Sequence, residues 1–408
     1  MFRKILLVVV LSLFSTASYA GCGIDAGSVR IIANDFPAIH AVGDAAKECE
    51  GGGVEISVNY NKDHKDIHVA ALTANPAEFT SSIVANSTFV DLHNGGLIRP
   101  LNDYVEKYGQ GISKSQLITI DGNVMAVAFM ANSAHLFYRE DILNAAGQNP
   151  PKSFEEMLAV AKAIKDKGLL EHPLGGIFKS GWNVGNEFVN LYLGHGGELF
   201  KSGTAEPNIN NAKGVAALNM MKKMTEYMNP DFLTHDSNAN QALWEGGKIA
   251  LVHLWGSRAG AVTDGENSTP EIENNTKFAG ALTVGGGSTP AAALWWDGFV
   301  IAKNIPDADA EATFRALANG VSLKMAQANK DAANWIIKGS SPTPAGVGVS
   351  ATAQAGAHPY PMVPFISSLH GAIGSEIVDF LQGKESAEQA LADVEAAYIT
   401  VAKEKGFL

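Results

Sequence analysis

Residues 29–37 read VRIIANDFP, an apolar run that ends in a turn signal. The run predicts a buried β-strand over Val29–Ala33, and Asn-Asp-Phe-Pro after it is typical of the start of a helix. That helix carries one apolar face, formed by Ile39, Val42, Ala46 and Cys49. Three consecutive glycines at 51–53 end it.

The pattern continues through the next fifty residues. Apolar and polar residues alternate over 54–60, and a second apolar segment covers 79–85, so both are expected strands. Helices are expected around 66–73 and from Thr88 to the glycines at 95–96. Strand, helix, strand, helix, strand predicts a doubly wound α/β unit with a parallel sheet.

The rest of the chain is mainly helical, with short strands expected at 125–130, 136–138 and 299–302. Two S-x-x-E/Q patterns mark helix starts as capping boxes, Ser153 with Glu156 and Ser386 with Gln389. The strand at 299–302 therefore returns after a long helical block.

Composition limits the kind of partner. The chain has 408 residues, a formal net charge of −12 and 46% hydrophobic residues. This length favours about two to three domains, and the hydrophobic content excludes global disorder. An acidic chain lacks the basic face that nucleic acids and anionic membranes attract.

The first twenty residues have the form of a secretory signal peptide. A short basic start precedes an apolar segment at 5–14, and Ser18-Tyr19-Ala20 fits a cleavage site after Ala20. We therefore expect a periplasmic protein. The two cysteines, Cys22 and Cys49, then indicate one disulfide, and the alternative is a lipidated Cys22 with a free Cys49.

Motifs for cofactors and catalysis are missing. There is no G-x-x-x-x-G-K-[ST] and no G-x-S-x-G, and GHGGEL at 194–199 has leucine in place of the last glycine of a dinucleotide motif. His64 and His68 are four residues apart but lack the H-E-x-x-H pattern, so a solvated helix face is expected and not a metal site. We expect no cofactor. A carboxylate pair for glycoside hydrolysis stays open.

Three short segments combine tryptophan with glycine and hydrogen-bonding residues: GWN at 181–183, LWGSR at 254–258 and LWWDG at 294–298. A sugar needs this mixture, because its C–H face stacks on an aromatic ring while its hydroxyls need fixed donors and acceptors. The alternative is that these tryptophans belong to the core. Side chains alternate along a strand, so only one of Trp295 and Trp296 is expected to face a ligand.

The order of several segments resembles the extracellular solute-binding proteins of carbohydrate ABC transporters (family 1, maltose-binding-protein-like). The segments are DGNV at 121–124, LFYREDIL at 136–143, PPKSFEEM at 150–157, LWEGGKIAL at 243–251 and GFVIAKN at 298–304. The resemblance implies a two-lobed periplasmic binding protein fold, each lobe a doubly wound sheet flanked by helices, with ligand in the cleft. Mapped onto this chain, one lobe comprises 21–132 plus 295–339 and the other 133–294 plus 340–408.

The resemblance and the strand ends together define the expected site. Ligand contacts are expected from strand ends, the first crossing, loops of the second lobe and the returning strand. The residues are Asn34, Asp35, Asn86, Ser87, Asn132, His135, Trp182, Asn183, Trp255, Arg258, Trp295, Trp296 and Asp297.

These features predict a monomeric, non-catalytic periplasmic protein that binds a neutral mono- or disaccharide and delivers it to the permease subunits of an ABC transporter. The alternative ligand is a polyol or an acidic sugar derivative, and Arg258 has three readings: it brackets a sugar hydroxyl, pairs with an acid structurally, or binds the carboxylate of an acidic sugar. A secreted carbohydrate-active enzyme is the alternative from another class.

Overall fold

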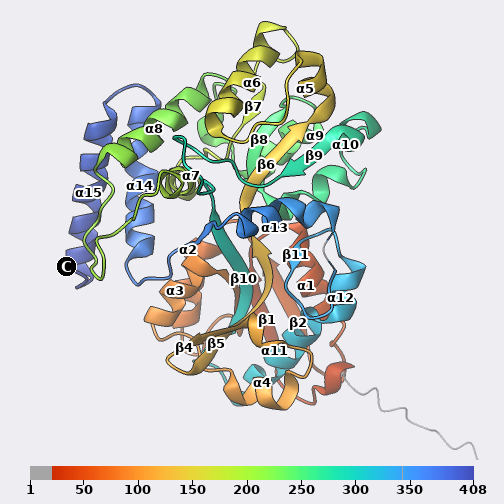
Figure 1. The fold of residues 1–408 in the computed structure, drawn as a ribbon. Helices are drawn as coiled ribbons and strands as arrows, with labels where there is room; N and C mark the ends of the chain where they lie inside the picture. The colour runs from red at the N-terminus through yellow and green to blue at the C-terminus, as the bar shows by residue number, and fades with distance from the viewer. Residues whose placement is uncertain (1–20, 342) are drawn as a thin grey trace, which may run out of the picture.

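The computed structural model describes residues 21–341 and 343–408, and the expected signal peptide at 1–20 lies outside them. Figure 1 shows two α/β lobes, one above the other, joined by strands and loops that pass between them. Within the described ranges, none of the helices has the length and apolar character needed to cross a bilayer.

The first lobe is built on an eight-stranded sheet with the order β11-β5-β10-β3-β1-β2, in which β4 pairs with β5 and β12 pairs with β10. Its strands are β1 (Val29–Ala33), β2 (Ile56–Tyr60), β3 (Ser81–Ala85), β4 (Leu117–Ile120), β5 (Asn123–Asn132), β10 (Ala293–Ile301), β11 (Asn334–Trp335) and β12 (His358–Pro359). Its helices are α1 (Pro37–Lys47), α2 (His64–Thr73), α3 (Asn86–Asn94), α4 (Asn102–Tyr108), α11 (Asp307–Gly320) and α12 (Leu323–Ala328).

The sheet is mixed, and this departs from the expected parallel arrangement. The strands β1, β2 and β3 are parallel to one another, but β10 runs antiparallel to both β3 and β5. The parallel strands end at the edge that faces the second lobe (Figure 1). Because β10 enters the sheet from that lobe, it must run in the opposite direction.

The second lobe has a four-stranded sheet with the order β7-β8-β6-β9. Its strands are β6 (Ala134–Arg139), β7 (Leu174–Gly175), β8 (Leu251–Trp255) and β9 (Thr276–Ala279). Its helices are α5 (Glu140–Ala146), α6 (Phe154–Asp166), α7 (Trp182–Gly194), α8 (Ala212–Thr225), α9 (Ser237–Glu245), α10 (Pro270–Asn275), α13 (Val347–Gln354), α14 (Ile366–Leu381) and α15 (Ala387–Glu404).

Each sheet has its own hydrophobic core. One core draws on residues between 24 and 130 and between 299 and 337, with Phe89, Phe129 and Phe314 fully buried in it. The other main core draws on residues between 136 and 295 and between 360 and 402, and a small cluster around Trp244 packs against the same sheet. A single residue, Ser133, separates β5 of the first sheet from β6 of the second. The lobes are thus separately packed and closely linked.

Both expected helix starts are found, but each is only half a capping box. The Ser153 and Ser386 hydroxyls accept hydrogen bonds from the backbone N–H of Glu156 and Gln389, each at 3.2 Å. In a complete capping box the Glu or Gln side chain also bonds to the backbone N–H of the serine, but here each of these side chains bonds elsewhere. The Glu156 carboxylate accepts from Lys152 N, and the Gln389 amide donates to Asp393.

Two further expectations have different outcomes. Cys22 and Cys49 form a disulfide, as the even cysteine count predicts, with their Cα atoms 5.2 Å apart. The expectation of a solvated face on α2 is wrong, because His64 and His68 are 7% and 0% exposed. Ile67 and Val69, two large hydrophobic residues of the same helix, are exposed instead.

Candidate functional site

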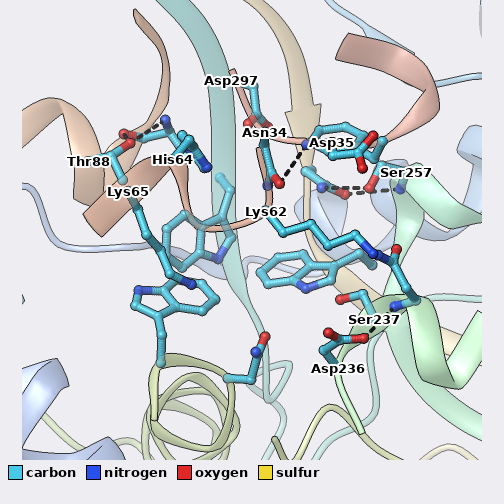
Figure 2. Close-up of a pocket in the computed structure, with 18 of the residues that line it drawn as sticks. Asn34, Asp35, Lys62, His64, Lys65, Thr88, Asp236, Ser237, Ser257 and Asp297 are labelled. Carbon is cyan, nitrogen blue, oxygen red and sulfur yellow. Dashed lines mark hydrogen bonds between the residues drawn. The ribbon is translucent and has the colours of Figure 1, made fainter. Parts of the chain in front are cut away.

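A cleft between the two lobes lies at the ends of the parallel strands. The segments that follow β1, β2 and β3 all reach it, which is the place where open α/β sheets bind ligands. They contribute Asn34, Asp35, Phe36, residues 62–65, Ser87 and Thr88. Figure 2 shows these side chains converging on one space from the first lobe.

The second lobe supplies the opposite wall through the start of α7, the start of α9 and the turn after β8. The lining residues there are Lys179, Trp182, Asn183, Asp236, Ser237, Asn238, Trp255, Ser257 and Arg258. Between the walls the cleft holds about 1120 Å³ of space not filled by atoms, part of it open to solvent. Trp295 and Asp297 reach the cleft from the crossing strand β10.

The structure brings ten of the expected site residues together in this lining. They are Asn34, Asp35, Ser87, Asn132, Trp182, Asn183, Trp255, Arg258, Trp295 and Asp297. Asn132 and Ser257 are also bonded to each other, since the Asn132 amide donates to Ser257 Oγ and accepts from Ser257 N, both at 3.2 Å. This pair joins the end of β5 to the turn after β8 and fixes both groups beside the cleft.

Asn86 and Trp296 lie outside the lining and support the crossing strand instead. The Asn86 side chain accepts from Trp296 N at 2.8 Å and donates to the Tyr360 carbonyl at 3.4 Å. Trp296 is on the opposite strand face from Trp295, and its ring meets Phe89 edge-on at 5.7 Å. Strand alternation therefore puts Trp295, and not Trp296, at the cleft.

His135 also lies outside the lining. It is fully buried in β6, where its ring stacks on Phe137 at 4.8 Å. Burial lowers the pKa of His135 to about 4, so the ring is neutral near pH 7. Its place directly after the crossing puts its backbone near the cleft while its side chain packs into the second lobe.

Several lining residues were not expected from the sequence. The segment 62–65 follows β2, so the strand-end argument that selected Asn34 and Ser87 applies equally to it. The group Asp236, Ser237 and Asn238 has the composition of a helix start, and Asp236 caps α9 by accepting from Asn238 N and Ala239 N at 3.0 Å. Phe36 directly follows Asp35 at the end of β1, so the strand-end argument covers it too, whereas Lys179 carried no sequence signal of this kind.

Three cleft tryptophans pack together, and they differ in which side chains cover each indole ring. Trp295 is 5% exposed, stacks on Tyr360 at 4.0 Å, and meets Trp182 and Trp255 edge-on at 5.6 and 5.7 Å. Trp182 stacks on His370 at 4.7 Å, and Lys65 Nζ lies 5.0 Å from the centre of the same ring. Trp255 is half-buried. Trp182 is half-buried too, but His370 and Lys65 already lie against its ring, so Trp255 is the tryptophan best placed to offer a ring face to a ligand.

Burial shifts the charges inside the cleft. It raises the pKa of the Asp297 carboxyl to about 7, and it lowers the pKa of the Arg258 guanidinium to about 10. Burial and the neighbouring His68 lower the pKa of His64 to about 3. Near neutral pH the cleft therefore holds a charged Arg258, a neutral His64 and an Asp297 near its midpoint.

Hydrogen bonding and stacking are the chemistry that this site offers. In the part of the chain that the structure describes, no three His, Cys, Asp or Glu side chains are grouped so that they could hold a metal ion. Amide, hydroxyl, carboxylate and cationic groups alternate with indole rings around the space. Such a mixture suits a small solute with many polar groups.

Comparison with known proteins gives the family. Residues 41–355 match the family model described as "Bacterial extracellular solute-binding protein". A "Probable ABC transporter-binding protein" of Deinococcus radiodurans is 26% identical over 182 residues, which cover 43% of this chain. The match spans only 42% of that relative's length.

Solved structures show the same fold over nearly the whole chain. A solute-binding protein from Agrobacterium radiobacter in complex with ribitol has a TM-score of 0.82 and 18% identity, covering 93% of this chain and 99% of its own. One from Agrobacterium vitis with bound D-mannitol has a TM-score of 0.78, 17% identity and the same coverage. Maltose-bound MalE3 of T. maritima has a TM-score of 0.78 and 16% identity, covering 92% of this chain and 100% of its own.

The matched family consists of binding proteins and not of enzymes, which removes the alternative of a carbohydrate-active enzyme. The two-lobed fold and the cleft at the strand ends agree with this assignment. The chain belongs to the bacterial extracellular solute-binding protein family.

Proposed function

We propose that this chain is the periplasmic substrate-binding component of an ABC transporter, and that its cleft holds a small carbohydrate or polyol. One observation carries the proposal. Trp255 and Trp295 lie in the same cleft as Asn34, Asn132, Asn183 and Ser257. An apolar ring face and a set of fixed donors and acceptors are what a polyhydroxylated solute requires.

The structural relatives support this choice of ligand class. These three relatives bind ribitol, D-mannitol and maltose. A neutral mono- or disaccharide is the simplest member of the class, and the sequence favours it. A linear polyol would use the same hydroxyl-binding groups.

The expected division into lobes forms part of the proposal. The lobes comprise 21–132 with 295–339 and 133–294 with 340–408, and they close on the solute. The closed monomer then docks on permease subunits in the membrane, after export through a cleaved signal peptide at 1–20. The separate hydrophobic cores support this division except at the crossings, where Trp295 packs in the second core and β12 (His358–Pro359) pairs with β10 of the first sheet.

A ligand panel tests the proposal. Purified protein is titrated by calorimetry with neutral and acidic monosaccharides, disaccharides, linear polyols and amino acids. We expect saturable binding of one solute from the first three groups, with the solute recovered unchanged. Binding restricted to amino acids, or no binding across the panel, would contradict the proposal.

A further inference from the structure

The cleft contains four cationic side chains, and three of them have no carboxylate partner. Lys179 Nζ is 3.5 Å from the Asp236 carboxylate. Among the residues that the structure describes, Lys62, Lys65 and Arg258 have no carboxylate oxygen within 4.0 Å, although all three line the space. Three cations at one solute site are more than hydroxyl groups require.

Arg258 is the most unusual of the three, because it is 9% exposed. Its Nη1 donates to Gln241 Oε1 at 3.2 Å, and the guanidinium lies 5.7 Å from the centre of the Phe36 ring. A guanidinium has five N–H donors, and a buried charge is stable only when it is paired and hydrogen-bonded. Within the described residues the remaining donors have no acceptor, so they are free for a group in the cleft.

The acids around Arg258 are engaged with other partners. Asp35 bonds to His40 Nε2 at 2.8 Å, Asp236 caps α9 and pairs with Lys179, and Glu245 accepts from the Gln241 amide at 2.7 Å. Asp63 is exposed at the rim. These acids attract Arg258 over a distance, but they do not supply the direct contact that its free donors need.

The positions of Arg258 and Lys62 indicate where an anionic group of the solute would bind. Arg258 and Lys62 line both the main cleft and a second pocket that opens beside it, so they stand at the junction of the two. Figure 2 shows the Lys62 side chain extending from the first lobe toward the wall that holds Asp236 and Ser237. Trp255, Trp295 and Asn132 line only the main cleft. A solute can thus place an acid group at the junction and its hydroxyls in the main cleft.

The net charge of −12 does not oppose this arrangement. Surface charges more than about 8–10 Å away are screened at physiological salt, while cations that line the site act at contact distance. The lining also holds four aspartates, Asp35, Asp63, Asp236 and Asp297, so an anionic group is favoured by the free donors of Arg258 and not by a net positive charge. A carboxylate matches the planar fork of one arginine. Glucose 6-phosphate is therefore included in the test, so that a phosphate group can be told apart from a carboxylate.

We propose that the solute is a small polyhydroxylated carboxylate, such as a sugar acid, whose carboxylate binds Arg258 and Lys62 while its hydroxyl groups bind in the main cleft. The inference rests on the proposed function and narrows its ligand class. It gives Arg258 a specificity-determining role.

The test compares acids with their neutral counterparts. Calorimetry is run with glucuronate and gluconate, with glucose and sorbitol, and with glucose 6-phosphate. We expect at least one of the two carboxylates to bind about ten- to a hundredfold more tightly than its neutral counterpart, the range for hydrogen bonds to a charged group. Its affinity should fall as salt is raised, while that of a neutral sugar should not.

Variants locate the effect. Arg258→Gln and Lys62→Gln should each lower the affinity for the carboxylate by about tenfold or more, and should lower the affinity for its neutral counterpart by a smaller factor, so that most of the preference is lost. Lys62 is exposed, so its substitution tests the proposal even if Arg258→Gln fails to fold. The matched control is Lys107→Gln, an exposed lysine on α4 at the far end of the first lobe, which should behave as wild type (Figure 1).

The failures can be told apart. Neutral solutes binding as tightly as the carboxylates would overturn the inference and leave the proposed function standing. Preference for glucose 6-phosphate would overturn the assignment to a carboxylate. Absence of binding by every carbohydrate and polyol, charged or neutral, would overturn the proposed function itself.

Discussion

Asp297 is a carboxyl group that lines the cleft but has apolar neighbours on both adjacent strands. It lies on β10, flanked by Ala85 on one side and Met130 on the other, at the floor of the cleft. Burial raises the pKa of its carboxyl to about 7, compared with about 3.9 in an unfolded chain. Between these two values the folded protein holds a proton that the unfolded chain has lost. The contribution of Asp297 to the free energy of unfolding therefore falls as pH rises from about 4 to about 7.

The first prediction concerns Asp297→Asn. The substitution should abolish this pH dependence and raise the free energy of unfolding at pH 8, by at most roughly 4 kcal/mol. It should also weaken binding of a neutral sugar by about 1.5–3 kcal/mol, because a charged acceptor is lost. Urea unfolding at pH 4.5 and 8, with calorimetry at pH 8, measures both. The control is Glu106→Gln at an exposed position, and identical pH slopes for wild type and Asp297→Asn would contradict the prediction.

The second prediction separates two tryptophans. Trp295→Ala should lower the free energy of unfolding by about 3–5 kcal/mol, because it opens a cavity among Tyr360, Trp182 and Trp255. Trp255→Ala should cost less stability, since Trp255 is half-buried, and should weaken ligand binding more. Denaturant unfolding and calorimetry on both variants make the comparison. If the two variants lost equal unfolding free energy and equal ligand affinity, the distinction between Trp255 and Trp295 would be wrong.

Helix α2 shows where sequence periodicity fails. Histidines four residues apart were expected on a solvated face, yet His68 is buried with its Nδ1 3.2 Å from Ser82 Oγ. Ile67 and Val69, which hydrophobicity would bury, are 38% and 37% exposed. Polar partners in the neighbouring strand decide this packing, and they are not adjacent in sequence. By contrast, β1, β2 and β3 follow from local apolar patterns because each is flanked by clear turn signals.

The third prediction tests the helix starts at α6 and α15. Ser153→Ala and Ser386→Ala should each lower the free energy of unfolding by about 1 kcal/mol, because each removes the hydroxyl that accepts an otherwise free N–H. Neither should change ligand affinity, since both helix starts lie outside the cleft lining. The control is Ser202→Ala at an exposed position. Thermal and urea unfolding measure the effect. The prediction is wrong if Ser153→Ala and Ser386→Ala have the same free energy of unfolding as wild type and the control.

The fourth prediction concerns the disulfide, which ties the start of the described chain to the segment after α1. The double variant Cys22→Ser/Cys49→Ser should lose about 3–3.5 kcal/mol of unfolding free energy, the chain-entropy value for a loop of this length. Ligand affinity should be unchanged, because α1 places about 16 Å of helix between Cys49 and the cleft. Reduction of the wild-type protein should reproduce the loss. A drop in affinity as large as the drop in stability would contradict this separation.

The site as a whole could be predicted only in part. The residues at strand ends and in tryptophan loops were accessible from the sequence, because their position depends on local signals. Lys179 and the start of α9 were not, because they reach the cleft only when the second lobe folds over the first. The antiparallel direction of β10 could not be predicted for a similar reason. Its direction depends on the chain's return from the other lobe and not on its own residues.

Contacts between the lobes lead to the last prediction. Lys65 on α2 lies over Trp182 on α7, and Arg258 after β8 lies over Phe36 after β1, so both pairs join opposite walls of the cleft. A ligand between these walls adds contacts that exist only when the walls are close, and it must therefore favour the closed arrangement. We expect small-angle X-ray scattering to show a smaller radius of gyration with saturating ligand than without it. Tryptophan fluorescence should change together with it, because Trp182, Trp255 and Trp295 line the space. At about 100 times the dissociation constant, the same ligand should add roughly 2.7 kcal/mol to the free energy of unfolding. A solute that gave this stabilisation with no change in scattering or fluorescence would show that binding occurs without closure.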